Sequence, residues 1–242
     1  VDKVRSFLWL PLYIRQQRVV QLKLSKDDEA ALQVEVAILE RVDHPNIVRM
    51  RQVFDCSKTF YMVMELMTGG ELFDRIVEKE KYSEEEARIV MQKLAEALVY
   101  CHSHGIVHRD LKPDNLLLTS FRGDNDFVKI LDFGIAKITE NNDANAAKLT
   151  QAGIVYGTPE YLSPEQALDS HAVDARADIY SFGVLLFELI SGQLPHSTDS
   201  FAEFVGNVRG DQSVRVEVLP KDPPKRVVNC LLRCLDPVAE RR

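Results

Sequence analysis

The order of apolar and polar residues in the first third of the chain predicts one helix and two strands. Residues 29–42 carry apolar side chains at helical spacing, and this pattern ends at His44-Pro45-Asn46. The apolar segments at residues 47–54 and 60–67 predict strands. Gly69-Gly70 follows the second strand and indicates a turn or hinge. We therefore expect a small, strand-rich lobe that ends at a hinge.

The pattern beyond the hinge predicts long helices. Residues 83–86 are similar to a capping box at a helix start, and an amphipathic pattern follows them to about Ser103. Residues 178–191 are almost wholly apolar and too many for one strand, so they predict a buried helix. Short apolar runs at residues 105–107 and 128–131 predict buried strands. The expected fold class is α+β, with a small β-rich lobe and a larger, mostly helical lobe.

Composition and charge argue against several classes of function. The chain has 242 residues with 45% hydrophobic content, which suffices for one large domain or for two lobes around a cleft. A net charge of -7 argues against nucleic acid or an anionic membrane as the main partner, because both require a clustered positive surface. The apolar segment at residues 7–14 is too short to span a bilayer and lacks the cleavage site of a secretory signal.

The cysteines indicate the cellular compartment. Cys56, Cys101, Cys230 and Cys234 form neither a disulfide framework nor a metal-ligand pattern. Cys230 and Cys234 would share one face of a helix, but no further pair of Cys or His accompanies them. We expect buried thiols in a reducing compartment, which indicates a cytoplasmic protein.

Polar side chains follow the two short buried strands. Asp110 and Asn115 come after residues 105–107, and Asp132 comes after residues 128–131. Loops at strand ends are where catalytic groups are usually displayed. Asp110 can accept the proton of an incoming alcohol, while Asn115 and Asp132 can supply oxygen ligands to Mg²⁺. The spacing therefore indicates phosphoryl transfer to a hydroxyl.

The two motifs at residues 108–115 and 132–134 resemble those of the protein kinase family, and the resemblance covers residues 35–241. Lys112 matches the serine/threonine pattern, in which this lysine helps to hold the transferred phosphoryl group. The resemblance implies a two-lobed kinase fold and a transferase that moves the γ-phosphate of ATP to Ser or Thr hydroxyls of proteins. It also implies Asp110 as the catalytic base, and ATP and Mg²⁺ as cofactors.

The family pattern also implies where the nucleotide binds. Glu35 matches the helix glutamate that pairs with the phosphate-binding lysine. Glu65 and Met67 would offer main-chain groups to the adenine, and Leu117 would pack beneath it. These assignments follow from the resemblance.

Acidic positions of the family imply a preference among substrates. Glu71, Asp114 and Glu188 match positions that, in related kinases, face the substrate residues before the target hydroxyl. Because carboxylates bind guanidinium groups in a bidentate manner, we expect a preference for Arg two or three residues upstream of Ser or Thr.

The resemblance implies two structural contacts in the large lobe. Glu165 should pair with an arginine near the end of the chain, either Arg241 or Arg242. Asp178 resembles a buried aspartate that holds the main chain of the catalytic loop. A buried carboxylate is costly unless it is fully hydrogen-bonded, which favours a fixed partner for Asp178.

Two features depart from the family pattern. The first glycine is Gly69, so the Gly-rich loop that covers the nucleotide phosphates in this family is absent. The phosphate-binding lysine is either Lys23 or has been replaced at Gln17, and the likeness of residues 23–28 to a family linker favours Gln17. The missing loop supports an alternative function, a pseudokinase or inactive kinase fragment that acts as an interaction module.

The resemblance to the kinase family also predicts the domain organisation. Residues 1–22 fall outside the resemblance, and residues 23–242 would form a kinase domain truncated at both ends. The small lobe would extend to about residue 66, and the large lobe would cover residues 69–242. Residues upstream of the second motif resemble calcium/calmodulin-dependent kinases, whereas those downstream resemble bacterial serine/threonine kinases.

Regulation is predicted at one threonine. Arg109 resembles the arginine that in many kinases pairs with a phosphate on the activation segment. Ile154 stands where many relatives carry a phosphorylatable Thr, whereas Thr150 matches a site of the bacterial-like pattern. We expect Thr150 to be the activating phosphosite, with Thr158 a structural hydroxyl near Asp110.

Overall fold

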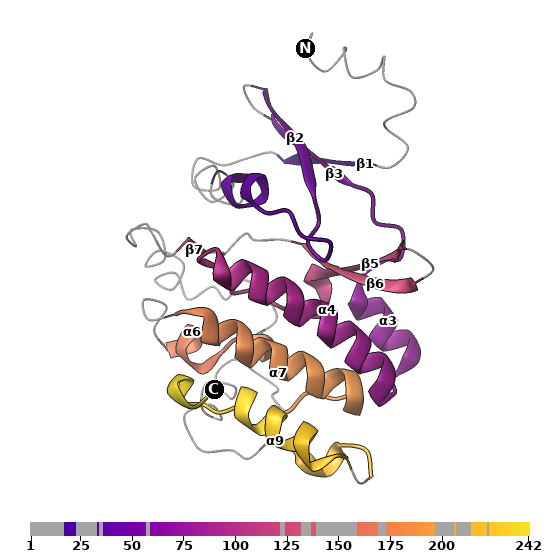
Figure 1. Cartoon of the computed structure of the whole chain (residues 1–242), viewed down its shortest axis with the longest axis vertical. Helices are drawn as coiled ribbons and strands as arrows, with labels where there is room; N and C mark the ends of the chain where they lie inside the picture. Colours follow the sequence, from indigo (N-terminus) through magenta and orange to yellow (C-terminus); the bar gives the residue numbers. More distant parts are fainter. Residues whose placement is uncertain are drawn as a thin grey trace.

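The computed structural model confirms the predicted α+β class. In Figure 1 the strands near the N-terminus lie at the top, and the helices of the later part of the chain lie below them. The structure describes residues 17–22, 33, 36–56, 59–121, 124–131, 137–138, 159–168, 173–196, 206, 214–221 and 223–242. These residues include a small strand-rich part and a larger helical part, as the sequence predicts.

The N-terminal sheet has three antiparallel strands in the order β1-β3-β2. The strands are β1 (Gln17–Leu22), β2 (Met50–Cys56) and β3 (Thr59–Glu65). Gln17 pairs with Glu65 at the end of β3, where the hinge begins. Residues 33 and 36–41, within the first predicted helix, are helical.

The strand expected at residues 47–54 begins later, at Met50, because the preceding residues bond to a different element. Ile47 forms a parallel bridge with Ile130, and the Val48 N–H donates to the Ile130 carbonyl at 2.9 Å. Ile130 is the last residue of β6 (Asp124–Ile130). The side-chain amide of Asn46 also donates to the carbonyl of Val128 in β6, at 2.8 Å. Residues 46–48 therefore attach the small lobe to β6.

Two glycines shape the segment after β3. The Gly69 N–H donates to the Leu118 carbonyl at 2.9 Å, and the Leu118 N–H donates to the Gly70 carbonyl at 2.9 Å. A Cβ atom on Gly69 would lie 2.8 Å from the carbonyl carbon of Leu118, which is closer than real Cβ atoms approach. Gly70 has a φ of 80°, a conformation that side chains disfavour. The hinge therefore requires glycine for both the close approach and the turn.

Helices α3 (Leu72–Lys79) and α4 (Glu84–Ser103) follow the hinge. The predicted capping box is confirmed at the start of α4. The Glu86 N–H donates to Ser83 Oγ at 3.3 Å, and the Ser83 N–H donates to Glu86 Oε2 at 2.9 Å. These bonds satisfy main-chain donors that the first helical turn leaves unpaired. The predicted end at Ser103 is also confirmed.

Both short buried strands that the sequence predicts are present. The first is β4 (Ile106–Val107), which pairs with β7 (Lys137–Ile138). The second is β6, which forms an antiparallel hairpin with β5 (Leu116–Phe121). A single 3₁₀ turn, η3 (Pro113–Asn115), connects the loop after β4 to β5. The motif at residues 108–115, which the family resemblance identifies as the catalytic loop, therefore lies between two strands.

The apolar helix predicted at residues 178–191 is α7 (Ala175–Ser191), which begins three residues earlier than expected. Asp174 caps the helix, since its side chain accepts from the Arg176 N–H at 2.8 Å. The apolar pattern alone cannot reveal a polar first turn. The remaining helical elements are η4 (Pro159–Tyr161), α6 (Pro164–Leu168), η6 (Val216–Val218), α9 (Lys225–Cys234) and η7 (Ala239–Arg241).

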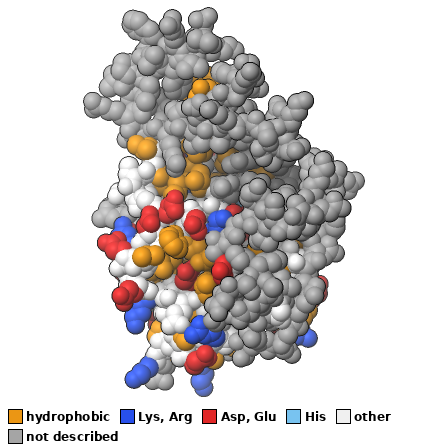
Figure 2. Space-filling model, turned by 180° about the vertical axis from the view of Figure 1, so that it is seen from behind, with side chains coloured by type: hydrophobic (Ala, Val, Ile, Leu, Met, Phe, Trp, Pro, Cys, Tyr) orange, Lys and Arg blue, Asp and Glu red, His pale blue; other side chains and the backbone are white. Residues whose placement is uncertain are grey.

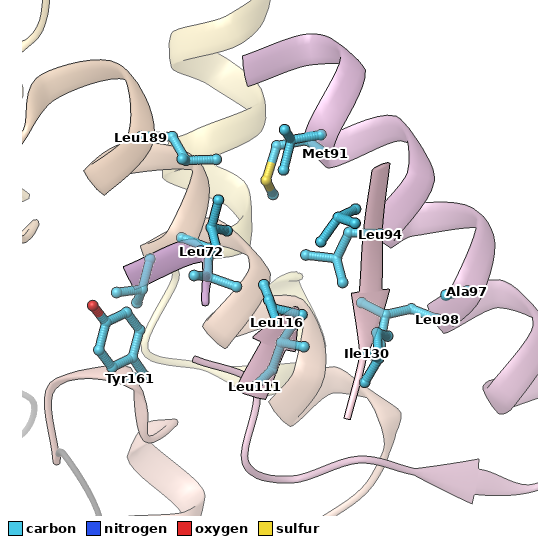
Figure 3. Close-up of a cluster of buried hydrophobic side chains, with 14 of the residues drawn as sticks. Leu72, Met91, Leu94, Ala97, Leu98, Leu111, Leu116, Ile130, Tyr161 and Leu189 are labelled. Atoms are coloured by element: carbon cyan, nitrogen blue, oxygen red, sulfur yellow. The ribbon is translucent and has the colours of Figure 1, made fainter. Parts of the chain in front are cut away.

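One apolar core joins the helices to the β5–β6 hairpin (Figure 3). Leu72 from α3, Leu94 from α4 and Leu116 from β5 are fully buried in it, and so is Leu189 from α7. Burial of a leucine side chain stabilises a fold by about 1.5–3 kcal/mol. Because Leu116 directly follows the catalytic-loop motif, the core fixes the end of that loop.

The surface carries charges of both signs. On the face shown in Figure 2, acidic and basic side chains are interspersed among the coloured residues. No helix within the described part of the chain is long and apolar enough to cross a membrane.

Cys101 and Cys234 are buried, but Cys230 is exposed, so the expectation of a buried thiol is wrong there. Helix α9 buries the face that carries Leu231 and Cys234, and Cys230 lies outside it.

Candidate active site

The side chains of the first motif converge on the carboxylate of Asp110. Asp110 Oδ2 accepts from the Asn115 side-chain amide at 2.8 Å and lies 3.0 Å from the Lys112 ammonium. The Asn115 amide nitrogen also donates to the Asp110 main-chain carbonyl at 2.8 Å. We call these three residues the Asp110 bracket. It holds a carboxylate, an amide and an ammonium in one place, all at the end of the buried strand β4.

Asp178 of α7 fixes the main chain in front of the bracket. Its side chain is 0% exposed and accepts from the N–H groups of His108 at 2.9 Å and Arg109 at 2.8 Å. His102 Nε2 of α4 donates to the same carboxylate at 2.7 Å. The two main-chain bonds are buried and the His102 side chain is 20% exposed, so the loss of this acceptor is costly mainly for the main-chain donors. The predicted role of Asp178 is confirmed.

Arg109 occupies a strained position in the catalytic loop. Its φ is 68°, which costs a residue with a side chain about 1–2 kcal/mol. The surroundings hold it there, because its carbonyl accepts from Gln166 Nε2 at 2.6 Å. The Arg109 guanidinium donates to the Val173 carbonyl at 3.1 Å, and the residue is buried.

The second motif begins one residue beyond a described contact. The Leu131 N–H donates to the Asn115 carbonyl at 2.8 Å, so the main chain just before Asp132 is bonded to the bracket. Asp132 itself lies outside the described residues, as do Glu35, Lys23 and Thr150. Within the described ranges, no group of three or more His, Cys, Asp or Glu residues could hold a metal ion.

The residues predicted to contact adenine lie where β3 and the hinge meet the β5–β6 hairpin. Leu117 is buried in a small apolar cluster with Met62 and Met64 of β3, against which Met67 packs. Glu65, at the end of β3, is only partly exposed. The structure therefore brings Met67 and Leu117 into one apolar cluster beside the hinge, and Glu65 lies at the end of the neighbouring strand β3.

One residue near the hinge was missed by the sequence predictions. Lys129 of β6 lies 2.6 Å from Glu65 and is buried. The available signal was a single charged residue within the apolar run Val128-Lys129-Ile130-Leu131. A lysine in a buried strand requires an acidic partner, but sequence alone cannot name the partner.

Two of the three predicted substrate-binding acids lie near each other. Glu188 of α7 accepts from the Tyr161 hydroxyl at 2.6 Å. Burial raises the pKa of Glu188 above its usual value, and the nearby negative charges of Asp114 and Glu160 raise it further, against the opposing effect of the Tyr161 bond. Glu71 is exposed and bridges to Leu117 at the hinge instead.

The predicted brace of the large lobe is present, with Arg242 rather than Arg241 as the cation. The Arg242 guanidinium donates to both carboxylate oxygens of Glu165, at 2.6 and 2.8 Å. The Arg242 side chain is 0% exposed and lies over the ring of Tyr180. This bidentate pair joins α6 to the end of the chain.

Comparison with known proteins gives one consistent result. The sequence profile of the protein kinase domain matches residues 16–237, a range that includes part of the segment at residues 1–22. Myosin light chain kinase A of Dictyostelium discoideum is 42% identical over 181 residues, which is 75% of this chain and 58% of that protein.

Two further relatives agree. Calcium/calmodulin-dependent protein kinase type IV of Mus musculus is 37% identical over 216 residues, covering 88% of this chain and 40% of that protein. CBL-interacting protein kinase 24 of Oryza sativa subsp. japonica is 39% identical over 181 residues, covering 74% and 37%. The chain thus spans less than two thirds of the length of these relatives. The relatives that it resembles are named as myosin light chain, calcium/calmodulin-dependent and CBL-interacting kinases. The chain belongs to the protein kinase family.

Proposed function

We propose that this chain transfers the γ-phosphate of ATP to serine and threonine hydroxyls of proteins, with Asp110 as the catalytic base. The observation that carries the proposal is the Asp110 bracket, in which Asn115 and Lys112 hold the carboxylate at 2.8 and 3.0 Å. A fixed carboxylate can orient the attacking hydroxyl and take its proton, and the Lys112 ammonium can balance charge on the transferred group. The alternative of an inactive interaction module is less well supported, because the bracket keeps the geometry that transfer needs.

The residues at the bracket suit a magnesium ion. The Asn115 amide nitrogen donates to Asp110, so its amide oxygen points away from that carboxylate and can serve as a metal ligand with Asp132. When bound, magnesium would neutralise the charge that develops between the phosphates of ATP. The bond between the Leu131 N–H and the Asn115 carbonyl would keep the two ligands adjacent.

The adenine of ATP would bind at the hinge. Main-chain groups of Glu65 and Met67 would bond to its edge, and Leu117 would form the apolar surface beneath it. Glu35 would pair with the phosphate-binding lysine if that residue is Lys23, whereas the register that we favour places Gln17 at the lysine position. This arrangement would direct the γ-phosphate of ATP toward the Asp110 bracket.

Substrate proteins would be selected by arginine upstream of the acceptor. The support is electrostatic: Glu188 is half-buried next to Asp114 and Glu160, and its pKa is raised first by burial and then by the negative charges of these two acids. A guanidinium placed among them would relieve their mutual repulsion and gain bidentate bonds. Glu71 would extend the acidic surface toward the hinge.

A peptide assay tests the reaction and the preference together. The protein is incubated with magnesium, radiolabelled ATP and serine peptides that carry Arg or Ala two and three residues upstream of the acceptor. We expect label on the serine, about tenfold faster with Arg, and none when the acceptor is Ala. Equal labelling of serine peptides with upstream Arg and with upstream Ala would refute the arginine preference. Absence of label from every serine peptide would refute the proposed function.

Regulation would act through Thr150 and Arg109. A phosphate on Thr150 would add about two negative charges that can order a loop beside a guanidinium. Mass spectrometry of protein incubated with ATP, followed by assay of Thr150→Ala, tests this role, and an unmodified Thr150 in a fully active sample would contradict it.

The location that we propose for the protein is the cytoplasm, where ATP and protein substrates are both present.

A further inference from the structure

A largely buried lysine ammonium lies against the partly exposed carboxylate of Glu65 at the hinge. Lys129 Nζ is 2.6 Å from Glu65 Oε1, and the two side chains are 10% and 22% exposed. The partners come from β6 and from the end of β3. A pair with so little exposure is weakly screened by salt, and removal of either partner leaves the other charge in a poorly hydrated position.

The Glu65 residue is held at both its side chain and its main chain. The Arg49 N–H donates to the same Oε1 atom at 2.8 Å, and the Glu65 N–H donates to the Arg49 carbonyl at 3.0 Å. The carboxylate therefore receives one charged and one neutral donor. If the charged donor is lost, the amide of Arg49 is the one donor among the described residues that still holds the side chain in this orientation.

Strand β6 connects this ion pair to the rest of the nucleotide site. Lys129 pairs with Leu117 across the β5–β6 hairpin. The next residue, Ile130, donates its N–H to the Asn46 carbonyl at 2.8 Å and accepts from Val48 at 2.9 Å. The same strand leads to Asp132. One strand thus contacts the residue proposed to lie beneath the adenine and the small lobe, and it precedes Asp132 in the sequence.

We propose that Lys129 is a positioning residue for the nucleotide, which acts through Glu65. The ion pair sets the distance between the hinge main chain and the strand that leads to Asp132. This inference rests on the proposed function, because it takes the hinge as the adenine site. Lys129 does not contact the nucleotide in this account, but it holds the residue whose main chain does.

The expected effect is specific to one substrate. The hinge main chain can shift when the ion pair is lost, which lengthens its bonds to adenine and weakens ATP binding. The Asp110 bracket is held separately by Asp178 and by the core around Leu116. The Michaelis constant for ATP should therefore rise, while kcat and the Michaelis constant for the peptide stay nearly constant.

The test compares a lysine within β6 with a lysine that contacts β6 from outside the strand. Lys129→Met removes the ammonium and keeps the apolar stem. Lys93→Met is the matched control, because Lys93 Nζ lies 4.9 Å from the ring centroid of Phe127 in β6. We expect Lys129→Met to raise KM for ATP and the Kd for magnesium-ADP about tenfold, with both constants changed less than about twofold in Lys93→Met.

Two further variants separate positioning from simple stability. Lys129→Arg keeps the positive charge and should restore nucleotide affinity to within about threefold of the parent. Glu65→Gln keeps an acceptor for Arg49 and should weaken nucleotide binding as Lys129→Met does. The double variant Glu65→Gln/Lys129→Met should be no weaker than the single variants, since both changes remove one interaction.

The outcomes distinguish this inference from the proposed function. Equal nucleotide affinity of Lys129→Met and Lys93→Met would overturn it, and so would a lower unfolding midpoint with an unchanged KM for ATP. If Lys129→Met does not fold, Glu65→Gln gives the same comparison. An unmodified protein that binds no magnesium-ADP and transfers no phosphate would refute the proposed function itself, whereas tight binding by both the parent and Lys129→Met would refute only the role of Lys129.

Discussion

The catalytic loop and the hinge are held in place by different means. At the catalytic loop, the fully buried Asp178 accepts from two main-chain N–H groups and from His102. At the hinge, Gly69 and Gly70 lie against the main chain of Leu118, and one partly exposed ion pair fixes Glu65. The loop is fixed by buried polar bonds, and the hinge is fixed by a close approach of main chains.

This difference predicts which property of the protein responds to a mutation in each region. Buried donors that lose their acceptor destabilise the whole fold, because the unfolded chain satisfies them with water. A hinge that loses its close contact can shift while the core remains packed. Mutation of Asp178, which anchors the catalytic loop, should therefore lower mainly the free energy of unfolding. Mutations at the hinge should also weaken nucleotide binding.

The largest expected effect is at the loop anchor. Asp178→Ala removes the acceptor of His108 and Arg109, so we expect the free energy of unfolding to fall by about 3 kcal/mol or more. Urea unfolding followed by circular dichroism measures this change. Asp174→Ala is the control on the same helix, since it removes an N-cap and an exposed ion pair with Arg176, which together are worth about 1–2 kcal/mol. Equal losses in the two variants would show that the buried bonds of Asp178 do not stabilise the fold more than an exposed helix cap does.

A smaller effect is expected at the hinge. Gly69→Ala would place a Cβ atom 2.8 Å from main-chain atoms of Leu118 and should cost about 1–3 kcal/mol of unfolding free energy. It should also weaken the binding of magnesium-ADP, measured by fluorescence titration. In Gly206→Ala a Cβ atom meets no neighbour within 4 Å among the described residues, so this helical control should be neutral or slightly stabilising. A neutral Gly69→Ala would show that the close contact is dispensable.

The smallest effect is expected at the exposed start of α4, away from both regions. Bonds from Lys79 and Ser83 lower the pKa of Glu86 from 4.5 to about 2. The folded chain thus binds this proton less tightly than the unfolded chain. The ionised Glu86 carboxylate therefore stabilises the fold fully above pH 4.5, and this stabilisation is lost as the pH falls toward 2.

Glu86→Gln should therefore lower the melting temperature slightly at pH 6 and should match the parent near pH 2. Thermal unfolding across this pH range measures the difference. Glu84→Gln, in the same first turn but outside the capping box, is the control. A constant difference between Glu86→Gln and the parent at every pH would contradict the assignment.

Much of the catalytic loop could be predicted from the sequence because its contacts are local or follow from the family motif. Asn115 lies five residues after Asp110, and the capping box of α4 lies within one helical turn. The partner of Asp178 was predicted for the same reason. The brace at Glu165 was predicted only as one of two arginines, since a sequence does not show which side chain turns inward.

The hinge was harder to predict because its contacts join distant segments. Lys129 and Glu65 are 64 residues apart, and neither position shows from its neighbours that the other lies beside it. The late start of β2 has a similar cause. Ile47 and Val48 have the apolar character of a strand, but they bond to β6 rather than to β3. The local sequence pattern predicts which residues are buried, whereas the strand or side chain that each residue pairs with depends on the whole fold.

The most direct test of the account is the rate of phosphate transfer by Asp110→Asn compared with that of the parent protein. The substitution keeps the size of the side chain and removes the proton acceptor. At saturating magnesium-ATP and peptide, we predict that kcat falls by a factor of about 10²–10⁴, while the urea midpoint changes little. A variant that folds normally and transfers phosphate as fast as the parent would contradict the central role of Asp110.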